Sequence, residues 1–213
     1  GSLFIQQEDG EFEKVSFEHD KLMEDTGSTL FDADQDGDLD LYVSSGSNEY
    51  AASLGYHDRL YLNDGNGSYS KTFNSLPKLA ESSGVVSPCD YDRDGDIDLF
   101  VGGRQVPGKY PAPASSRILE NSGLNDAGEP IFIDVTGVSA RGLIDLGMVT
   151  DALWLDFDQD NDEDLIIVGE WMPVTIFRND SERLNNVTED VGLGASTGWW
   201  FSLNSGDFDG DGD

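Results

Sequence analysis

Short apolar runs separated by polar, glycine-containing segments recur along the chain. Three of these runs, at residues 41–43, 99–101 and 165–168, show no alternation of apolar and polar positions. Short runs that are rich in β-branched and aromatic residues are typical of strands buried on both faces. We therefore expect a fully buried strand at each of the three positions.

A different pattern follows each buried run. Residues 59–63, 117–121 and 175–179 come closer to the alternation of a half-exposed strand. The start of the chain repeats this segment, since residues 2–6 match residues 59–63 at a constant offset of 57. Each copy is predicted to be the third strand of a repeated unit, followed by a glycine-containing turn and a fourth strand.

The complete unit reads as strand, acidic loop, strand, variable loop, strand, turn and strand. This order predicts a four-stranded antiparallel meander. The first strands are expected at residues 29–31, 84–89, 149–155 and 199–205. Helical periodicity is weak throughout, and the short helical turn that the sequence predicts lies near residues 78–82.

The spacing of the units indicates the architecture. The acidic loops begin at residues 32, 90, 156 and 207, and intervals of 58, 66 and 51 residues lie in the range of propeller blades. We predict an all-β fold, a partial β-propeller with three complete blades. Residues 1–213 are expected to form one propeller fragment, divided into part-blade 1–27, blade 28–83, blade 84–146, blade 147–197 and part-blade 198–213. A closed ring of four units is an alternative, but the missing second strand of the last unit counts against it.

The acidic loops dominate the charge of the chain. Acidic residues outnumber basic residues by 43 to 12, which gives a formal net charge of −31. Such a charge opposes binding to nucleic acid, because the electrostatic part of that binding requires a basic surface. Nineteen of the acidic residues are aspartates in four ladders that share the same spacing.

The ladders carry the oxygen donors that a calcium ion requires. Carboxylates at positions one, three, five and nine, a backbone carbonyl at seven and a turn-forming residue at six supply a flexible all-oxygen shell. EF-hand loops open in the same way but need a glutamate at position twelve, where this chain has Val43, Val101 and Ile167. We expect three complete Ca²⁺ sites and a truncated fourth. The candidate metal ligands are Asp32, Asp34, Asp36, Asp38, Asp40, Asp90, Asp92, Asp94, Asp96, Asp98, Asp156, Asp158, Asp160, Asp162, Asp164, Asp207, Asp209 and Asp211.

These ladders and the strands that follow them resemble FG-GAP/VCBS repeats. Such repeats form the calcium-loop blades of integrin α-subunit heads and of secreted bacterial proteins, including those associated with ASPIC/UnbV segments. The resemblance covers nearly the whole chain, although the literal Phe-Gly and Gly-Ala-Pro signatures are missing and residues 84–89 stand in their place. It implies a parent propeller of about seven blades, structural Ca²⁺ on one rim, and free loops between the second and third strands on the other.

The loops on that other rim are the candidate ligand surface. Rigid scaffolds commonly present binding residues on loops, and aromatic and hydrogen-bonding groups suit recognition of a protein or a glycan. We therefore expect a role in adhesion or recognition, with a protein or glycan as partner. The candidate rim residues are Asn48, Tyr50, Tyr56, His57, Arg104, Tyr110 and Trp171.

Catalysis is not expected. The two histidines, His19 and His57, stand in neither a nucleophile elbow nor a zinc-binding spacing. One alternative is the calcium-stabilised propeller of a polysaccharide lyase-like enzyme, with His57 or Tyr110 as the base, and another is a purely structural repeat domain. The absence of an apolar run of about 18 residues argues against a transmembrane segment. Millimolar calcium outside cells favours an extracellular, cell-surface or periplasmic location.

Overall fold

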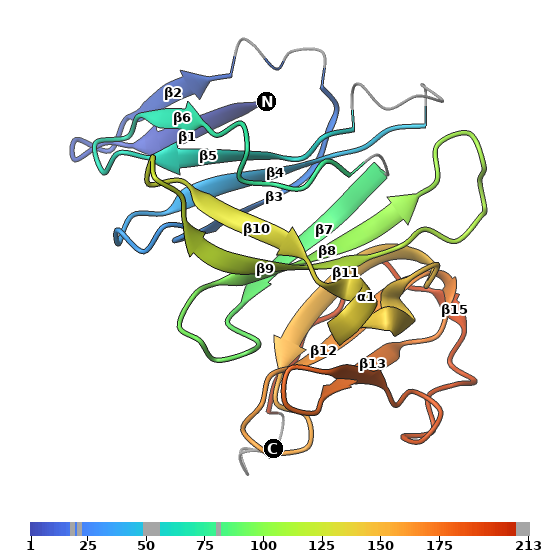
Figure 1. Ribbon diagram of the computed structural model, residues 1–213. Helices are drawn as coiled ribbons and strands as arrows, with labels where there is room; N and C mark the ends of the chain where they lie inside the picture. The colour runs from blue at the N-terminus through green and yellow to red at the C-terminus, as the bar shows by residue number, and fades with distance from the viewer. Residues whose placement is uncertain (18–19, 21–22, 49–55, 80–81, 208–213) are drawn as a thin grey trace.

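Antiparallel meanders of neighbouring strands make up the chain (Figure 1). The computed structural model describes residues 1–17, 20, 23–48, 56–79 and 82–207. In this part a hairpin of β1 (Ser2–Gln6) and β2 (Phe12–Ser16) comes first, and three larger sheets follow it along the chain.

Each larger sheet contains four strands in the order of the chain. The first sheet has β3 (Asp25–Phe31), β4 (Asp40–Ser45), β5 (Arg59–Asn63) and β6 (Tyr69–Lys71). The second has β7 (Ser82–Cys89), β8 (Asp98–Gln105), β9 (Arg117–Leu124) and β10 (Pro130–Asp134). The third has β11 (Met148–Leu155), β12 (Asp164–Met172), β13 (Thr175–Asn179) and β14 (Leu184–Asn186), and β15 (Gly198–Trp199) pairs with β12. All pairs are antiparallel, so the predicted all-β fold of propeller-type meanders is confirmed.

The hydrophobic core lies between successive sheets. Leu41 and Val43 of β4 pack with Tyr61 on the side of the first sheet that faces the hairpin. Tyr42, which lies between them in the strand, belongs instead to the cluster shared with Leu99 of the second sheet. Adjacent strand residues point to opposite faces. Strand β4 is therefore buried on both faces, as its continuous apolar pattern predicts.

The third strands are more buried than the sequence predicts. In β5, Arg59, Leu60 and Tyr61 are all buried, and the first three residues of β13 are buried as well. Leu60 packs in the cluster shared with the second sheet, whereas Tyr61 packs in the cluster on the opposite side. Arg59 is buried because it is paired with Asp25. The polar residue Arg59 in β5 is therefore both paired and buried, and it is not exposed to solvent.

The first strands of the three sheets approach one another closely. Strand β7 contacts both β3 and β11. The Ser44 hydroxyl donates a hydrogen bond of 2.6 Å to the carbonyl oxygen of Gly84. Gly27 lies at this junction, where a Cβ atom would come within 2.6 Å of the same Gly84 oxygen. Glycine permits this approach, which arranges the sheets as blades around their first strands.

The short helical segments lie outside the predicted position. Residues 80 and 81 of the predicted turn fall outside the described chain, and Ser82 is already part of β7. The observed segments, α1 (Thr136–Ser139) and η2 (Arg141–Leu143), connect β10 to β11. The Thr136 hydroxyl accepts a hydrogen bond of 2.9 Å from the Ile118 amide, so this connection is fixed to β9 by a contact distant in sequence.

The predicted strand at residues 199–205 is also shorter than expected. Beyond β15, the Trp200 amide makes one more backbone bond, to the Gly169 carbonyl oxygen of β12 at 3.2 Å. The segment also bonds to side chains of β11: Thr150 donates its hydroxyl to the Trp200 carbonyl oxygen at 2.7 Å, and the Leu203 amide donates to Asp151 Oδ2 at 2.9 Å. These side-chain bonds do not form a backbone ladder, so no regular strand follows among the described residues.

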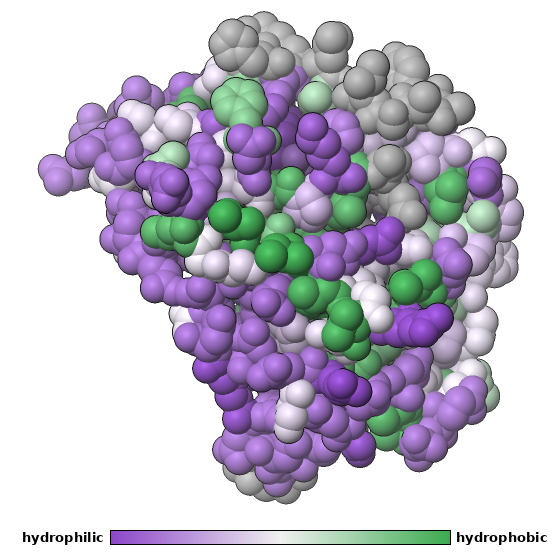
Figure 2. Space-filling view, in the orientation of Figure 1, coloured by the Kyte–Doolittle hydropathy of each residue, from purple (hydrophilic) through white to green (hydrophobic). Residues whose placement is uncertain are grey.

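The face of the molecule in Figure 2 is mostly polar, in keeping with the net charge of −31. A narrow band of apolar residues crosses it over β10 and α1. Ile133 of β10 and Val138 of α1 are among the exposed apolar side chains. This band, along the outer strand of the second sheet, stands out from smaller apolar patches elsewhere on the face.

Candidate metal centres

The three complete aspartate ladders form the loops between the first and second strands of the sheets. Each loop makes its turn with two residues in the left-handed region, at positions four and six. Glycine at position six was predicted, and Asn161 replaces it in the third loop with φ 69°. Position four was not predicted, because glutamine and arginine carry no signal for this conformation. These residues are Gln35 (φ 62°), Arg93 (φ 64°) and Gln159 (φ 63°).

Aspartates gather in a group of three in each loop. In every group the carboxylate oxygens that could serve as ligands lie within 4.8 Å of one another. The three groups are Asp32, Asp34 and Asp36; Asp90, Asp92 and Asp94; and Asp156, Asp158 and Asp164. In the third loop the ninth aspartate takes the place of the fifth. The predicted ladders therefore each contain three aspartates that could hold a metal ion.

Backbone donors fix the first aspartate of each loop. The amide of Gly37 donates to Asp32 Oδ2 at 3.0 Å, and the amides of Gly95 and Asn161 do the same for Asp90 and Asp156 at 3.2 and 2.8 Å. The other oxygens of Asp32 and Asp90 are buried and have no hydrogen-bond partner. A buried carboxylate oxygen without a partner is costly, since it has lost its water and gained no donor. A cation bound in each of the two loops would satisfy the buried oxygen there, so the residues present fit a metal ion.

The ninth aspartates are buried and connect each loop to the third strand of its own sheet. Asp40 is fully buried and accepts hydrogen bonds of 2.8 Å from the amides of Ala33 and Asn63. Asp164 is held in the same way by Phe157 at 3.0 Å and Asn179 at 2.7 Å. This carboxylate therefore has a structural role in addition to any role as a ligand.

The second oxygen of the remaining ninth aspartate is unsatisfied. Asp98 is 1% exposed; its Oδ1 accepts from the Asn121 amide at 2.8 Å, while its Oδ2 has no partner. Burial, together with the charges of Asp92 and Asp94, raises the pKa of Asp98 to about 8. Burial also raises the pKa of Asp40 to about 6, against the lowering effect of its backbone donors. Burial is the larger cause of both shifts in pKa, and the neighbouring carboxylates add to it.

The sequence interpretation missed a set of asparagines at the ends of the third strands. Asn63, Asn121 and Asn179 occupy the same place in each unit and donate backbone amides to the ninth aspartates. Their recurrence at intervals of 58 residues is visible in the sequence. It could have indicated a role in supporting the loops.

The fourth ladder falls mainly outside the described chain. Asp207 is described and exposed, whereas Asp209 and Asp211 lie beyond the described residues. The truncated fourth site therefore stays a prediction. The contributions of Asp38, Asp96 and Asp162 through their carbonyl oxygens also stay predictions.

The described candidate rim residues lie at the opposite ends of the strands, and four of the seven candidates fall between β4 and β5 in the sequence. Tyr50 lies outside the described residues. Tyr56 is 2% exposed and thus packs in the interior, where a ligand on the rim does not reach it. His57 donates from Nδ1 to the carbonyl oxygen of Leu79 at 3.0 Å. Asn48, at the start of this loop, is exposed and accepts a hydrogen bond of 2.7 Å from the Gly108 amide of the next sheet.

Two exposed aromatic residues lie in the neighbouring sheets, Tyr110 in the loop between β8 and β9 and Trp171 near the end of β12. Tyr110 is 53% exposed and Trp171 is 60% exposed. Trp171 has φ 62°, which is unusual for a bulky side chain, and its ring lies 5.0 Å from that of Trp199 between centroids. Arg104 forms an ion pair with Glu170, next to Trp171. The structure thus pairs Arg104 with the residue that precedes Trp171 and keeps Tyr56 away from the surface.

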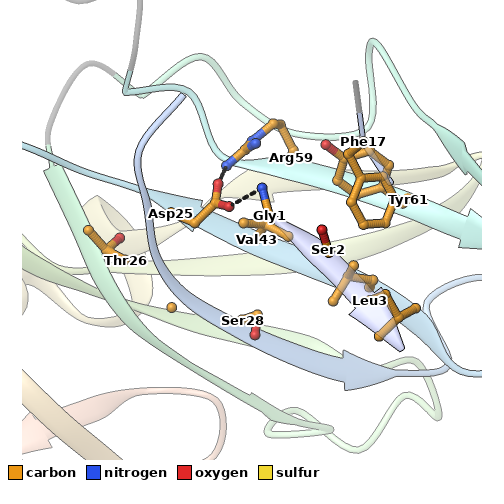
Figure 3. Close-up of a pocket in the computed structure, with 12 residues that line it drawn as sticks. Gly1, Ser2, Leu3, Phe17, Asp25, Thr26, Ser28, Val43, Arg59 and Tyr61 are labelled. Carbon is orange, nitrogen blue, oxygen red and sulfur yellow. Dashed lines mark hydrogen bonds and ion pairs between the residues drawn. The ribbon is translucent and has the colours of Figure 1, made fainter. Parts of the chain in front are cut away.

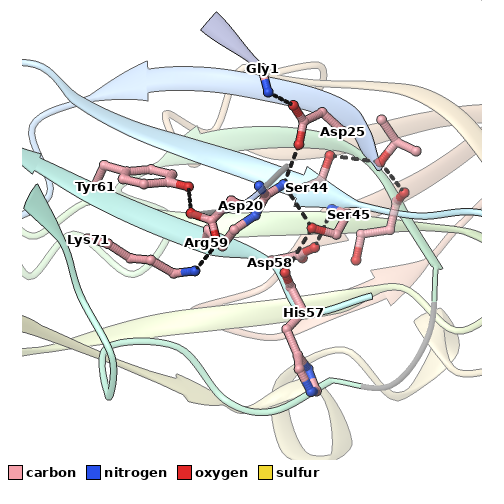
Figure 4. Close-up of polar contacts among 12 residues, drawn as sticks. Gly1, Asp20, Asp25, Ser44, Ser45, His57, Asp58, Arg59, Tyr61 and Lys71 are labelled. Atoms are coloured by element: carbon pink, nitrogen blue, oxygen red, sulfur yellow. Dashed lines mark hydrogen bonds and ion pairs between the residues drawn. The ribbon is translucent and has the colours of Figure 1, made fainter. Parts of the chain in front are cut away.

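A network of charged residues lies in the first sheet, away from the aspartate loops (Figure 4). Arg59 is 3% exposed and donates from Nη2 to Asp25 at 2.5 Å and to the Ser45 hydroxyl at 3.0 Å. Asp20 accepts from Tyr61 at 2.5 Å and from Lys71 at 2.6 Å. Burial raises the pKa of Asp20, but these two hydrogen bonds and the charges of Lys71 and Arg59 outweigh burial and lower it.

A cleft of about 320 Å³ lies beside this network, between the hairpin and the first sheet (Figure 3). Its walls combine apolar side chains such as Leu3 and Phe17 with the charged groups of Asp25 and Arg59. Because the Arg59 guanidinium is already paired with Asp25, the charged groups of the cleft serve the fold.

The comparison with protein families identifies the repeats. The family model described as FG-GAP-like repeat matches residues 32–101 and 156–213. Both matched stretches begin at the first aspartate of a ladder, Asp32 and Asp156. No curated protein matches the chain.

Proposed function

The chain belongs to the FG-GAP-like repeat family, and on that premise we propose that its three aspartate loops bind Ca²⁺. The bound ion stabilises one rim of the blades. The opposite rim recognises a protein or a glycan in an adhesive or recognition role.

One observation carries the metal assignment. Asp32 and Asp90 each keep a buried carboxylate oxygen that no group in the described chain satisfies. The donors around these atoms are carboxylates, without histidine or cysteine in the groups of three. An all-oxygen set on a loop favours a hard cation, and Ca²⁺ tolerates irregular geometry better than Mg²⁺ does. The chain would supply the carboxylates, and the ion would supply the positive charge that allows them to lie together.

Calorimetric titration with Ca²⁺ tests the assignment. Asp207→Ala serves as the background, so that binding at the fourth ladder does not enter the count. Asp34→Ala, Asp92→Ala and Asp158→Ala should each lower the stoichiometry by one ion. Glu163→Ala is the matched control, because it removes an exposed acidic charge from the third loop outside its group of three. An unchanged stoichiometry in the three aspartate variants would overturn the assignment.

The recognition role rests on the exposed aromatic residues of the opposite rim. Tyr110, in the loop between β8 and β9, and Trp171, near the end of β12, present large exposed side chains on a stable scaffold. Glycan arrays and binding assays with candidate proteins test this role. Trp171→Ala should abolish a signal that Phe73→Ala, a change at another exposed aromatic residue, leaves intact. A signal that survives both changes would place recognition elsewhere.

The proposal includes an extracellular, cell-surface or periplasmic location and no catalysis. Sites of modest affinity suit compartments with millimolar calcium. None of the helices in the described chain is long and apolar enough to cross a membrane. Assays for turnover of acidic polysaccharides test the absence of catalysis, and activity that disappears in His57→Ala or Tyr110→Phe would favour the lyase-like alternative.

A further inference from the structure

The strand-end asparagines connect the metal loop of one blade to the blade that follows it. Asn121, within the third strand of the second sheet, is 3% exposed and donates from Nδ2 to the carbonyl oxygen of Ala33 at 3.1 Å. Asn179, its counterpart in the third sheet, is 1% exposed and donates to the carbonyl oxygen of Tyr91 at 2.8 Å. Ala33 and Tyr91 both occupy position two of the preceding loop. The same contact therefore crosses both boundaries between the larger sheets.

Position two is where such a contact can affect metal binding. Ala33 is fully buried and lies between the ligand candidates Asp32 and Asp34. Its amide donates to Asp40 at 2.8 Å, and its carbonyl oxygen accepts from Asn121. With both polar groups of the residue held, the backbone on either side of it cannot rotate freely. The directions of the two neighbouring carboxylates are then fixed before an ion arrives.

Asn121 serves two loops with different groups. Its backbone amide donates to Asp98 of its own loop at 2.8 Å, while its side chain reaches the preceding loop. Changing this side chain therefore removes the contact between blades, together with a bond of 3.1 Å from the Gly123 amide, and leaves the backbone contact with Asp98. The Asn179 side chain donates both to the preceding loop and, at 3.3 Å, to the carbonyl oxygen of Glu163 in its own loop. The Asn63 side chain donates to the carbonyl oxygen of Leu39 in its own loop at 3.2 Å.

A second set of contacts joins the same loops at position four. Gln35 donates from Nε2 to the carbonyl oxygen of Gly95 at 3.4 Å. Arg93 forms an ion pair with Asp162 of the third loop. The residues at position four, which the left-handed turn orients, thus lie against the next loop along the chain.

We infer that the first two metal loops are completed by the blade that follows each of them: Asn121 is a positioning residue for the ion in loop 32–40, and Asn179 is one for the ion in loop 90–98. The inference rests on the proposed calcium binding. The affinity of each of these loops then depends on an amide side chain in the blade that follows it along the chain.

Hydrogen exchange measured by mass spectrometry tests the inference on the whole chain, because peptides from the three loops report Ca²⁺ binding separately. In Asn121→Ala the Ca²⁺ concentration that protects loop 32–40 should rise about tenfold, while that for loop 90–98 stays unchanged. In Asn179→Ala the Ca²⁺ concentration that protects loop 90–98 should rise about tenfold, while that for loop 32–40 stays unchanged. Asn125→Ala is the matched control, since Asn125 bonds within the turn between β9 and β10 and should alter no loop.

The outcomes separate the inference from the proposed function. Absence of Ca²⁺ protection in every loop of the unaltered chain would overturn the proposed function. Protection in that chain together with an unaltered loop 32–40 in Asn121→Ala, or with equal weakening of all loops, would overturn the inference alone.

A reciprocal measurement covers the case in which the asparagine variants do not fold. In Asp92→Ala/Asp158→Ala, where only loop 32–40 of the three is complete, Ca²⁺ should increase the protection of residues 117–124 in β9. Coupling between two sites acts equally in both directions. Unchanged exchange in β9 on filling loop 32–40 would overturn the inference.

Discussion

The two rims of the blades are held by different kinds of contact. On the aspartate rim, the same backbone bonds recur in every loop: an amide at position six on the first aspartate, and an amide from the third strand on the ninth. On the opposite rim, the contacts of the candidate rim residues differ from one boundary between sheets to the next. Asn48 there accepts from Gly108, and Arg104 pairs with Glu170.

This difference indicates which contacts must be the same in every blade and which contacts can vary between blades. A loop whose shape depends on backbone donors to fixed carboxylates tolerates little change at the aspartates. A loop held by occasional side-chain pairs can change from blade to blade. We therefore assign stability to the first rim and recognition to the second, and the following experiments test that division.

Removal of calcium should produce the largest effect. At free Ca²⁺ about one hundred times the dissociation constant, each independent site adds about 2.7 kcal/mol to the free energy of unfolding, so three sites add about 8 kcal/mol. Urea denaturation with and without excess EDTA measures the difference. Sodium chloride at matched ionic strength is the control, because salt also screens the repulsion of a chain with charge −31. An equal gain from salt alone would contradict the metal assignment.

Asp40 should matter even without calcium, whereas Asp36 should not. Asp40→Ala leaves the buried amides of Ala33 and Asn63 without their acceptor. We expect it to lower the free energy of unfolding in EDTA by about 3 kcal/mol. Asp36→Ala removes an exposed carboxylate and should cost less than about 1 kcal/mol in EDTA. Equal losses in EDTA would remove the distinction between a ligand and a residue that ties strands together.

The network of Asp20 and Lys71 should stabilise the first sheet independently of calcium. The pKa of Asp20 in the folded chain lies below its ordinary value of 3.8. Its contribution is therefore complete above that value and is lost as the pH falls through the lower folded-state pKa. Lys71→Met should cost about 2 kcal/mol at neutral pH and almost nothing in strong acid. Denaturation at several pH values in EDTA measures this, and a cost that persists unchanged in acid would refute it.

Substitution on the recognition rim should have the smallest effect on stability. Trp171→Ala loses its contact with the Trp199 ring but leaves every aspartate loop intact. We expect a change of less than about 1 kcal/mol in the free energy of unfolding and no change in Ca²⁺ stoichiometry. Calorimetry measures both quantities. A large loss of stability would show that Trp171 supports the fold, so that this rim is not a separate binding surface.

Features set within one unit could be read from the sequence. The aspartate spacing is local, and the apolar run of β4 directly reports burial on both faces. Features set by a neighbouring blade could not. The burial of Leu60 and Tyr61 requires sheets on both sides of β5, and Tyr56 was expected on the surface because nothing in its own segment indicates that it is buried.

Candidate site residues follow the same division. The left-handed conformation of Gln35 is set by the whole loop, since glutamine has no intrinsic preference for it. The side chain of Asn121 reaches a carbonyl oxygen 88 residues earlier in the chain. Contacts of that kind become visible only when the sheets are placed beside one another.

The contact of Asn121 with Ala33 has a consequence for the order in which the chain assembles. Strands within a sheet are neighbours in sequence, so each meander can form early, and N-terminal segments fold first during synthesis. The first calcium loop nevertheless lacks one hydrogen bond until residue 121 has emerged and the third strand of the next blade is in place. Because of this contact, tight ion binding by the first blade requires that the third strand of the following blade is already in place.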